Sequence, residues 1–147
     1  MTRAQLRERI DSIGVEELGR RYALRTVTQL NAMYVAHAEV IEFAPEDRDW
    51  IDSVGFDGEQ LTDDEFFRMI LSALDAAADH RGALWCIADG PMDHLVGRDN
   101  SFALRFHQAR RDHASVNAAF DAMHEDLDTC GLAHGWWAND YPSRHAR

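Results

Sequence analysis

The chain has 147 residues, of which 46% are hydrophobic and 28% are charged, so it is long enough and apolar enough to form one globular domain with its own core. This composition excludes disordered, collagen-like and disulfide-rich chains, and no apolar run approaches the roughly 18 residues of a membrane-spanning helix. The 26 acidic residues outnumber the 15 basic residues, which are all arginines. The resulting net charge of −11 disfavours direct binding to nucleic acids and anionic membranes and favours basic partners.

The N-terminal third has apolar residues at intervals of three and four, which is the spacing of one helix face. It predicts a short amphipathic helix over residues 2–13 that ends at Gly14. The longest periodic run, residues 15–43, predicts a second, long helix with a kink near Gly19. Pro45 is the expected stop of this helix.

The middle of the chain is strongly acidic: residues 39–65 hold eleven acidic residues and one arginine. A proline, two glycines and many carboxylates predict an acidic loop over about residues 44–62, with at most one helical turn around Trp50. Its aromatic and aliphatic residues are expected to anchor the loop to the body of the protein. Thr62 and Glu65 then have the spacing of a capping box, which predicts the start of a helix that reaches about Asp79.

The second half alternates short apolar segments with glycine or proline. Gly82 is expected to end the preceding helix, and residues 89–91, Asp-Gly-Pro, to separate two others, with Pro91 in the first turn of the second. Short helices are predicted over residues 83–88, 91–96 and 102–109, a last long helix over 116–127, and an irregular tail over about 131–147. No segment alternates as a strand does. We therefore predict an all-α fold, a single compact domain over residues 1–147 with six or seven helices and short antiparallel helix pairs in its second half.

The sequence contains no strong catalytic or metal-binding motif, and we predict no catalytic residue, metal or cofactor. His37 and Glu39 match half of the zinc deaminase signature, but Cys86 and Cys130 do not form its P-C-x-x-C half. An enzyme with a metal site in the helical bundle stays open as an alternative. Its ligands would be Asp121, His124, Glu125 and Asp128 together with His37 or His113. The N-terminus lacks the apolar region of a secretory signal, and the two cysteines are far apart, so we expect a cytoplasmic protein.

Residues 83–96, ALWCIADGPMDHLV, contain Gly-Pro followed by one apolar, two polar and two apolar residues. This motif, with a helix predicted on each side, resembles an uncharacterised family of small bacterial helical domains over about residues 60–125. The resemblance implies a helical fold with a tight helix–turn–helix and no established activity. It is compatible with an immunity or accessory role.

The acidic segment is the best candidate for a functional surface. We expect it to bind a basic protein or nucleoprotein complex by occupying sites that otherwise hold phosphates, as an immunity protein, an antitoxin or a phage-encoded inhibitor would. Trp50 or Phe56 would be the desolvated anchor among rim charges. The predicted partner-binding residues are Glu42, Glu46, Asp47, Asp49, Trp50, Asp52, Phe56, Asp57, Glu59, Asp63 and Asp64. Reversing Asp47, Asp49 and Asp52 to arginine is expected to weaken association with little loss of fold.

A scaffold or oligomerising subunit is the first alternative to this binding role, and the metal-dependent enzyme is the second. Trp136 and Trp137 in the tail would then contact a second copy of the chain, giving a homodimer.

Overall fold

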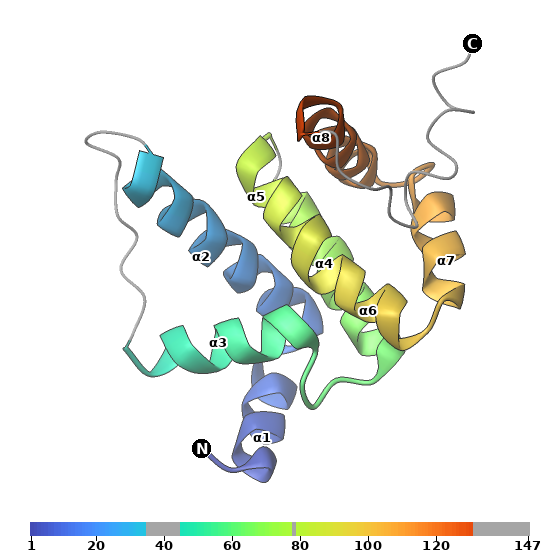
Figure 1. The fold of residues 1–147 in the computed structure, drawn as a ribbon. Coiled ribbons are helices and arrows are strands. Elements are labelled where there is room, and N and C mark those ends of the chain that lie inside the picture. The colour runs from blue at the N-terminus through green and yellow to red at the C-terminus, as the bar shows by residue number, and fades with distance from the viewer. Residues whose placement is uncertain (35–44, 78, 131–147) are drawn as a thin grey trace.

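The computed structural model describes residues 1–34, 45–77 and 79–130, except the side chains of residues 45–49 and 125–130, and these residues are helical without strands. The elements are α1 (Arg3–Ile13), α2 (Val15–Tyr34), α3 (Pro45–Asp57), α4 (Asp63–Ala77), α5 (Arg81–Ile87), the π-helical turn η1 (Ala88–Met92), α6 (Asp93–Arg98), α7 (Ser101–Ala109) and α8 (Ala114–Cys130). With α5, η1 and α6 counted as one continuous helix, this part of the chain has seven helices in one compact domain (Figure 1). The predicted all-α fold is confirmed.

Helix α1 has the boundaries that its sequence predicts. Thr2 and Gln5 form a capping box, in which each side chain accepts a hydrogen bond from the other residue's backbone N–H. Gly14 follows the last turn with a φ of 85°, and its N–H donates to the Ile10 carbonyl. The left-handed backbone at Gly14 turns the chain directly into α2, so the end predicted at this glycine is confirmed.

Helices α2 and α4 form the centre of the molecule and lie side by side (Figure 1). They approach closely at Gly19, where an added Cβ would lie 2.2 Å from the Met69 carbonyl oxygen. Only glycine leaves room for the α4 backbone at this crossing. The described part of the predicted long helix ends at Tyr34, and residues 35–44 lie outside the described residues.

Helix α3 corrects the prediction of an acidic loop. Residues 45–57 form a regular helix with Pro45 in its first position, where the missing N–H costs nothing. Trp50, Ile51 and Val54 are spaced as one helix face, and all three are buried. The apolar face therefore outweighs the glycine and the carboxylates, and α3 packs across α2 and against η1 (Figure 1).

The segment around Pro91 corrects a second prediction. The sequence predicts a break at residues 89–91, but the helix continues from α5 through η1 into α6. The wider π turn lets the chain pass a proline, which has no N–H to donate, and the Asp93 N–H reaches back to the Ala88 carbonyl. Gly82 lies inside the first turn of α5 rather than at the end of α4.

The start of α4 confirms the predicted capping box. The Thr62 N–H donates to Glu65 Oε1 over 3.0 Å, and the Glu65 N–H donates to Thr62 Oγ1 over 3.2 Å. Arg7 of α1 adds a two-point contact, donating to Glu65 Oε1 over 2.8 Å and to Oε2 over 2.6 Å. This single carboxylate caps α4 and holds α1 against it.

Glu65 should make the stability of the protein depend on acid pH. Hydrogen bonding to Arg7 lowers the pKa of Glu65 from 4.5 to about 2. A carboxyl group with a depressed folded-state pKa stabilises the fold above its unfolded pKa and loses that contribution as pH falls towards the folded value. We expect about 2 kcal/mol of unfolding free energy to disappear between pH 5 and pH 2. Urea denaturation across this range would show a smaller loss in Glu65→Gln, whereas Glu59→Gln, at an exposed carboxylate that accepts from Ser53, should follow the wild type.

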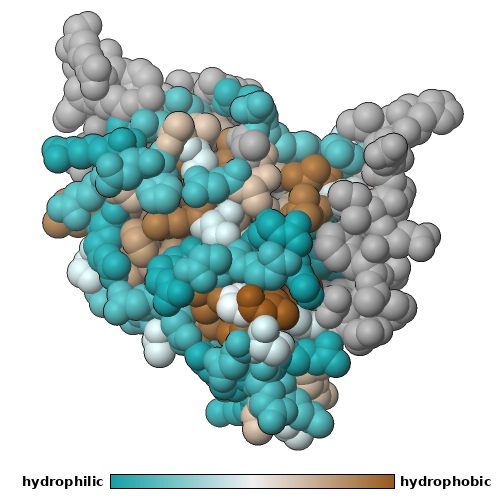
Figure 2. Space-filling view, turned by 180° about the vertical axis from the view of Figure 1, so that it is seen from behind, coloured by the Kyte–Doolittle hydropathy of each residue, from teal (hydrophilic) through white to brown (hydrophobic). Residues whose placement is uncertain are grey.

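The core is a continuous cluster contributed by every described helix. Its largest fully buried side chains are Phe66, Phe106, Phe120, Ile10, Leu18, Ile51, Met69, Ile70, Leu74, Leu84, Ile87 and Met92. In the second half, α5 packs with α8 and α6 with α7, so helix pairs are present as predicted. Figure 2 shows hydrophilic side chains over most of one face, with hydrophobic ones in separate small areas. None of the described helices is long and apolar enough to cross a membrane.

Candidate functional site

The predicted partner-binding residues fall on α3, on the turn after it and on the start of α4. Glu42 lies outside the described residues, and Glu46, Asp47 and Asp49 lie on the first turns of α3, where side chains are not described. The structure places the other seven within residues 50–64. These seven residues differ sharply in burial and in their contacts with the rest of the protein. They therefore do not form one uniform surface.

Two of the carboxylates, Asp63 and Asp64, are engaged by arginines of the protein itself. Arg98 lies 2.7 Å from Asp63 Oδ1, and Arg105 lies 2.6 Å from Asp64 Oδ1. Each of these guanidinium groups also covers an aromatic ring, Arg98 at 5.6 Å from the Phe66 centroid and Arg105 at 4.3 Å from that of Phe67. The charges of Asp63 and Asp64 are therefore compensated locally, although both aspartates remain at the surface.

The two candidate anchors lie in different environments. Trp50 is only 5% exposed and belongs to the core, so its ring is not presented to a partner in this conformation. Phe56 is 48% exposed and is one of five exposed large hydrophobic residues in the described part of the chain. Its ring contacts Gly90 of η1 and packs edge-on against His94, with ring centroids 4.7 Å apart. Phe56 is thus held from one side and open on the other.

Asp52 is held by a buried arginine of α2. Arg25 donates from Nε to Asp52 Oδ1 over 2.7 Å and from Nη2 to Oδ2, which is the two-point geometry that arginine and carboxylate favour. The Arg25 side chain is 8% exposed, whereas that of Asp52 is 44% exposed. The pair therefore joins α2 to α3 from inside, and the solvent side of the carboxylate remains accessible.

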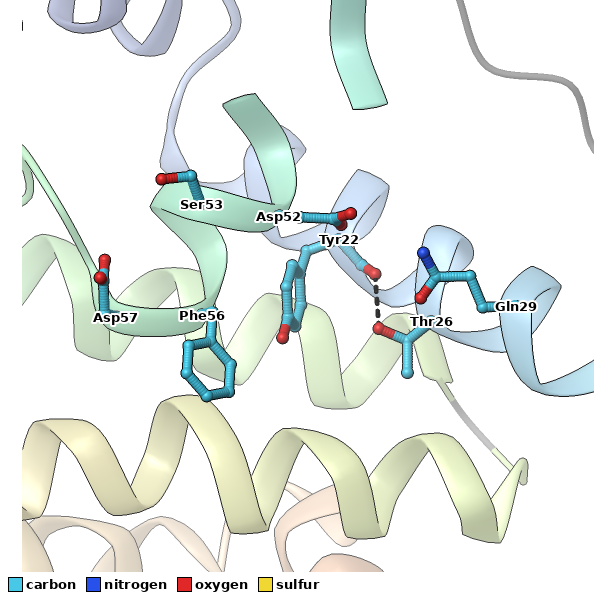
Figure 3. A pocket seen from close by; sticks show the side chains of 7 residues that line it. All are labelled: Tyr22, Thr26, Gln29, Asp52, Ser53, Phe56 and Asp57. Carbon is cyan, nitrogen blue, oxygen red and sulfur yellow. Dashed lines mark hydrogen bonds between the residues drawn. The ribbon is translucent and has the colours of Figure 1, made fainter. Parts of the chain in front are cut away.

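A pocket of about 370 Å³ opens between α2 and α3 beside this pair (Figure 3). Helix α2 contributes three polar or aromatic residues one turn apart, and α3 contributes the opposite wall. The lining residues are Tyr22, Thr26, Gln29, Asp52, Ser53, Phe56 and Asp57. The pocket is thus small, acidic and aromatic on one side, and it includes three of the predicted site residues.

Tyr22 is the most buried of the residues that line this pocket. It is 9% exposed, and its ring lies against the backbone of Gly55, where an added Cβ would come within 2.3 Å of the ring. Burial, together with the nearby Asp52 carboxylate, raises the pKa of Tyr22 well above its ordinary value. The phenol therefore stays neutral and keeps a hydroxyl that can both donate and accept.

Other groupings in the described residues do not form a reaction centre. Ser115 donates to Asp75 over 2.5 Å and His113 lies 3.3 Å from the same carboxylate, so the aspartate, rather than the histidine, contacts the hydroxyl. Within the described residues, no three histidine, cysteine, aspartate or glutamate side chains converge as metal ligands. His37 and the side chains of Glu125 and Asp128, three of the proposed metal ligands, lie outside them, as do Trp136 and Trp137.

Comparison of the chain with protein-family models, with curated proteins and with solved structures gives no match. The resemblance over about residues 60–125 therefore stays a prediction, and the functional conclusions below rest on the geometry of this chain.

Sequence reasoning missed Tyr22, Thr26 and Gln29, which lie on a helix predicted mainly for its apolar face. Their spacing of four and three puts them on one stripe of α2, and this spacing was the only sequence feature that could have grouped them. The spacing alone does not say that α3 lies opposite.

Proposed function

We propose that this protein binds a basic protein partner through the outer face of α3 and the turn after it. The observation that carries the proposal is the exposed ring of Phe56, flanked on the same helix by Asp52 and Asp57. An aromatic side chain held by the fold and surrounded by carboxylates has the composition of a binding hot spot inside a charged rim. Such a surface would suit an immunity protein, an antitoxin or a phage-encoded inhibitor acting in the cytoplasm.

The acidic residues and Phe56 have different parts in this proposal. The carboxylates of residues 46–59 raise the local concentration of a basic partner and speed association, an effect that salt screens. Phe56 loses its remaining contact with water when the partner docks, and this slows dissociation. The arginine-paired Asp63 and Asp64 contribute less, because their charges are already compensated.

The structure also changes the best charge-reversal experiment. Asp52→Arg would place a second guanidinium beside the buried Arg25, so this substitution tests the fold as much as the binding. We therefore choose Asp47, Asp49 and Glu59, and replace all three with arginine. The matched control reverses Glu8, Asp79 and Asp112, which are exposed acidic residues elsewhere and give the same change in net charge.

The expected result is a fall of at least about tenfold in association rate for the Asp47/Asp49/Glu59 variant, with a weaker dependence on salt. The partner is first captured from nuclease-treated host lysate, identified by mass spectrometry and purified, and its association is then measured by surface plasmon resonance. The control variant should retain most of the wild-type rate. Equal effects of the two variants, or a partner that is not basic, would contradict the proposal.

A further inference from the structure

We propose that the pocket between α2 and α3 binds the guanidinium group of an arginine side chain supplied by the basic partner. This inference rests on the proposed function and specifies which chemical group of the partner the site recognises. Three observations carry it: the polar lining, the hydroxyl of Tyr22, and the way in which the protein holds its own arginines.

The polar lining is rich in hydrogen-bond acceptors. Asp57 and the solvent side of Asp52 offer carboxylate oxygens, and the Gln29 side chain offers an amide oxygen. Thr26 uses its hydrogen to donate to the Tyr22 carbonyl over 2.9 Å, so its lone pairs are left to accept (Figure 3). A guanidinium has five N–H donors and no acceptor, which matches such a wall.

The Tyr22 hydroxyl gives the pocket a neutral polar group on its most buried lining residue. Figure 3 shows the ring between Phe56 and Thr26. A neutral phenol oxygen can accept a hydrogen bond as well as donate one. A guanidinium N–H entering the pocket would therefore find an acceptor in this hydroxyl.

The protein already holds two of its own arginines in the arrangement that we propose here. Arg105 contacts the carboxylate of Asp64 and lies over the rings of Phe67 and Phe102, at 4.3 and 4.6 Å from their centroids. Arg98 likewise combines Asp63 with the Phe66 ring. A carboxylate beside an aromatic face thus binds an arginine side chain twice in this fold. Ion pairing and cation–π attraction act there on the same planar group.

The described residues that line the pocket offer the same combination, and no arginine is among them. Phe56 and Tyr22 supply aromatic surface and Asp57 supplies the carboxylate. A volume of about 370 Å³ is at the small end for a ligand pocket, so it suits one side chain rather than a larger molecule. Arginine is favoured over lysine because a planar guanidinium stacks on rings and donates to several acceptors at once, whereas an ammonium is a compact point charge.

The test uses acetyl-arginine-amide as the probe, with acetyl-lysine-amide and acetyl-citrulline-amide as comparisons. Nuclear magnetic resonance titration of the full chain should show saturable shifts of the Tyr22 and Phe56 ring signals with the arginine probe. The lysine probe should bind more weakly, and neutral citrulline should give no saturable shift. Tyr22→Phe removes the hydroxyl and keeps the ring against Gly55, and we expect it to weaken the arginine probe about tenfold.

Tyr34→Phe is the matched control, because Tyr34 lies on the same helix, is 76% exposed and is not in the pocket. This variant should bind the probe as the wild type does, and both variants should keep the wild-type melting temperature. Equal affinity of Tyr22→Phe and wild type, or shifts that spare Tyr22 and Phe56, would overturn the proposed site.

The partner experiments separate this inference from the proposed function. If the basic partner binds Tyr22→Phe as tightly as wild type but loses affinity on reversal of Asp47, Asp49 and Glu59, the arginine site is overturned and the proposed function stands. If the probe fills the pocket while partner binding ignores the charge reversal, the proposed function is overturned, and with it the assignment of the guanidinium to a protein partner.

Discussion

Replacing Gly19 with alanine is expected to destabilise the fold by about 3 kcal/mol. The new Cβ would lie 2.2 Å from the Met69 carbonyl oxygen and 3.0 Å from the Ala73 nitrogen. Both atoms belong to the backbone of α4, so no flexible side chain can move aside, and the two central helices must separate. Separation would loosen the core packing on both helices, including buried Leu18 and Ile70. Urea denaturation at neutral pH measures the loss directly.

Gly97 provides a control with the same chemical change. It lies in α6, and an added Cβ there would meet no atom within 4 Å. Alanine at this position should stabilise the protein by about 0.5–1 kcal/mol, because it restricts the unfolded chain and has the better helix propensity. The two substitutions are therefore expected to differ in sign. A Gly19→Ala protein as stable as Gly97→Ala would show that α2 and α4 do not cross at Gly19 as closely as described.

Local signals in the sequence predicted the helix boundaries well where side chain and backbone act on neighbouring residues. The capping box of Thr62 and Glu65 and the turn at Gly14 need no knowledge of the rest of the fold. The apolar spacing of α7 and α8 likewise follows from the burial of one helix face. For such elements, sequence and structure agree because the interactions that define them are short in range.

Glycine and proline misled the prediction wherever their role depended on a distant element. Gly55 suggested a loop, but it lies inside α3. Glycine is needed there because the ring of Tyr22 occupies the space that a side chain would fill. Gly90 is similarly covered by Phe56, and Pro91 fits because the turn around it has widened. These residues serve close contacts between helices, and the sequence does not reveal which helix is the neighbour.

In the candidate site too, local features could be predicted from the sequence and contacts between helices could not. The acidic character of residues 39–65 and the choice of Trp50 or Phe56 as the anchor came from reading one segment. The exposure of Phe56 and the burial of Trp50 came from the structure. The pocket could not be predicted, because it exists only where α3 lies across α2 and residues of both helices line one hollow. Nor could the sequence show which of these carboxylates Arg25, Arg98 and Arg105 already hold.

The Arg25–Asp52 pair should respond unequally to the loss of each member. Asp52→Ala leaves the Arg25 guanidinium, which is 8% exposed, without its carboxylate, and we expect a loss of about 3 kcal/mol. Arg25→Met removes the buried charge, fills most of the same volume and leaves an aspartate that water already reaches. Its expected cost is about 1 kcal/mol. Urea denaturation of both single variants tests this order.

The double variant Arg25→Met/Asp52→Ala decides whether charge is the cause. If the loss of the Asp52 carboxylate beside the buried guanidinium makes Asp52→Ala costly, removing Arg25 as well should recover most of the loss, and the double variant should be close to Arg25→Met in stability. Additive losses would instead assign the cost to packing between α2 and α3. The same cycle bears on the binding surface, because an Asp52 fixed from inside by Arg25 presents the remaining lone pairs of its two oxygens in one orientation. Asp52 would then serve the fold and the proposed recognition of arginine together, whereas Asp57 and Glu59 could be changed without this structural cost.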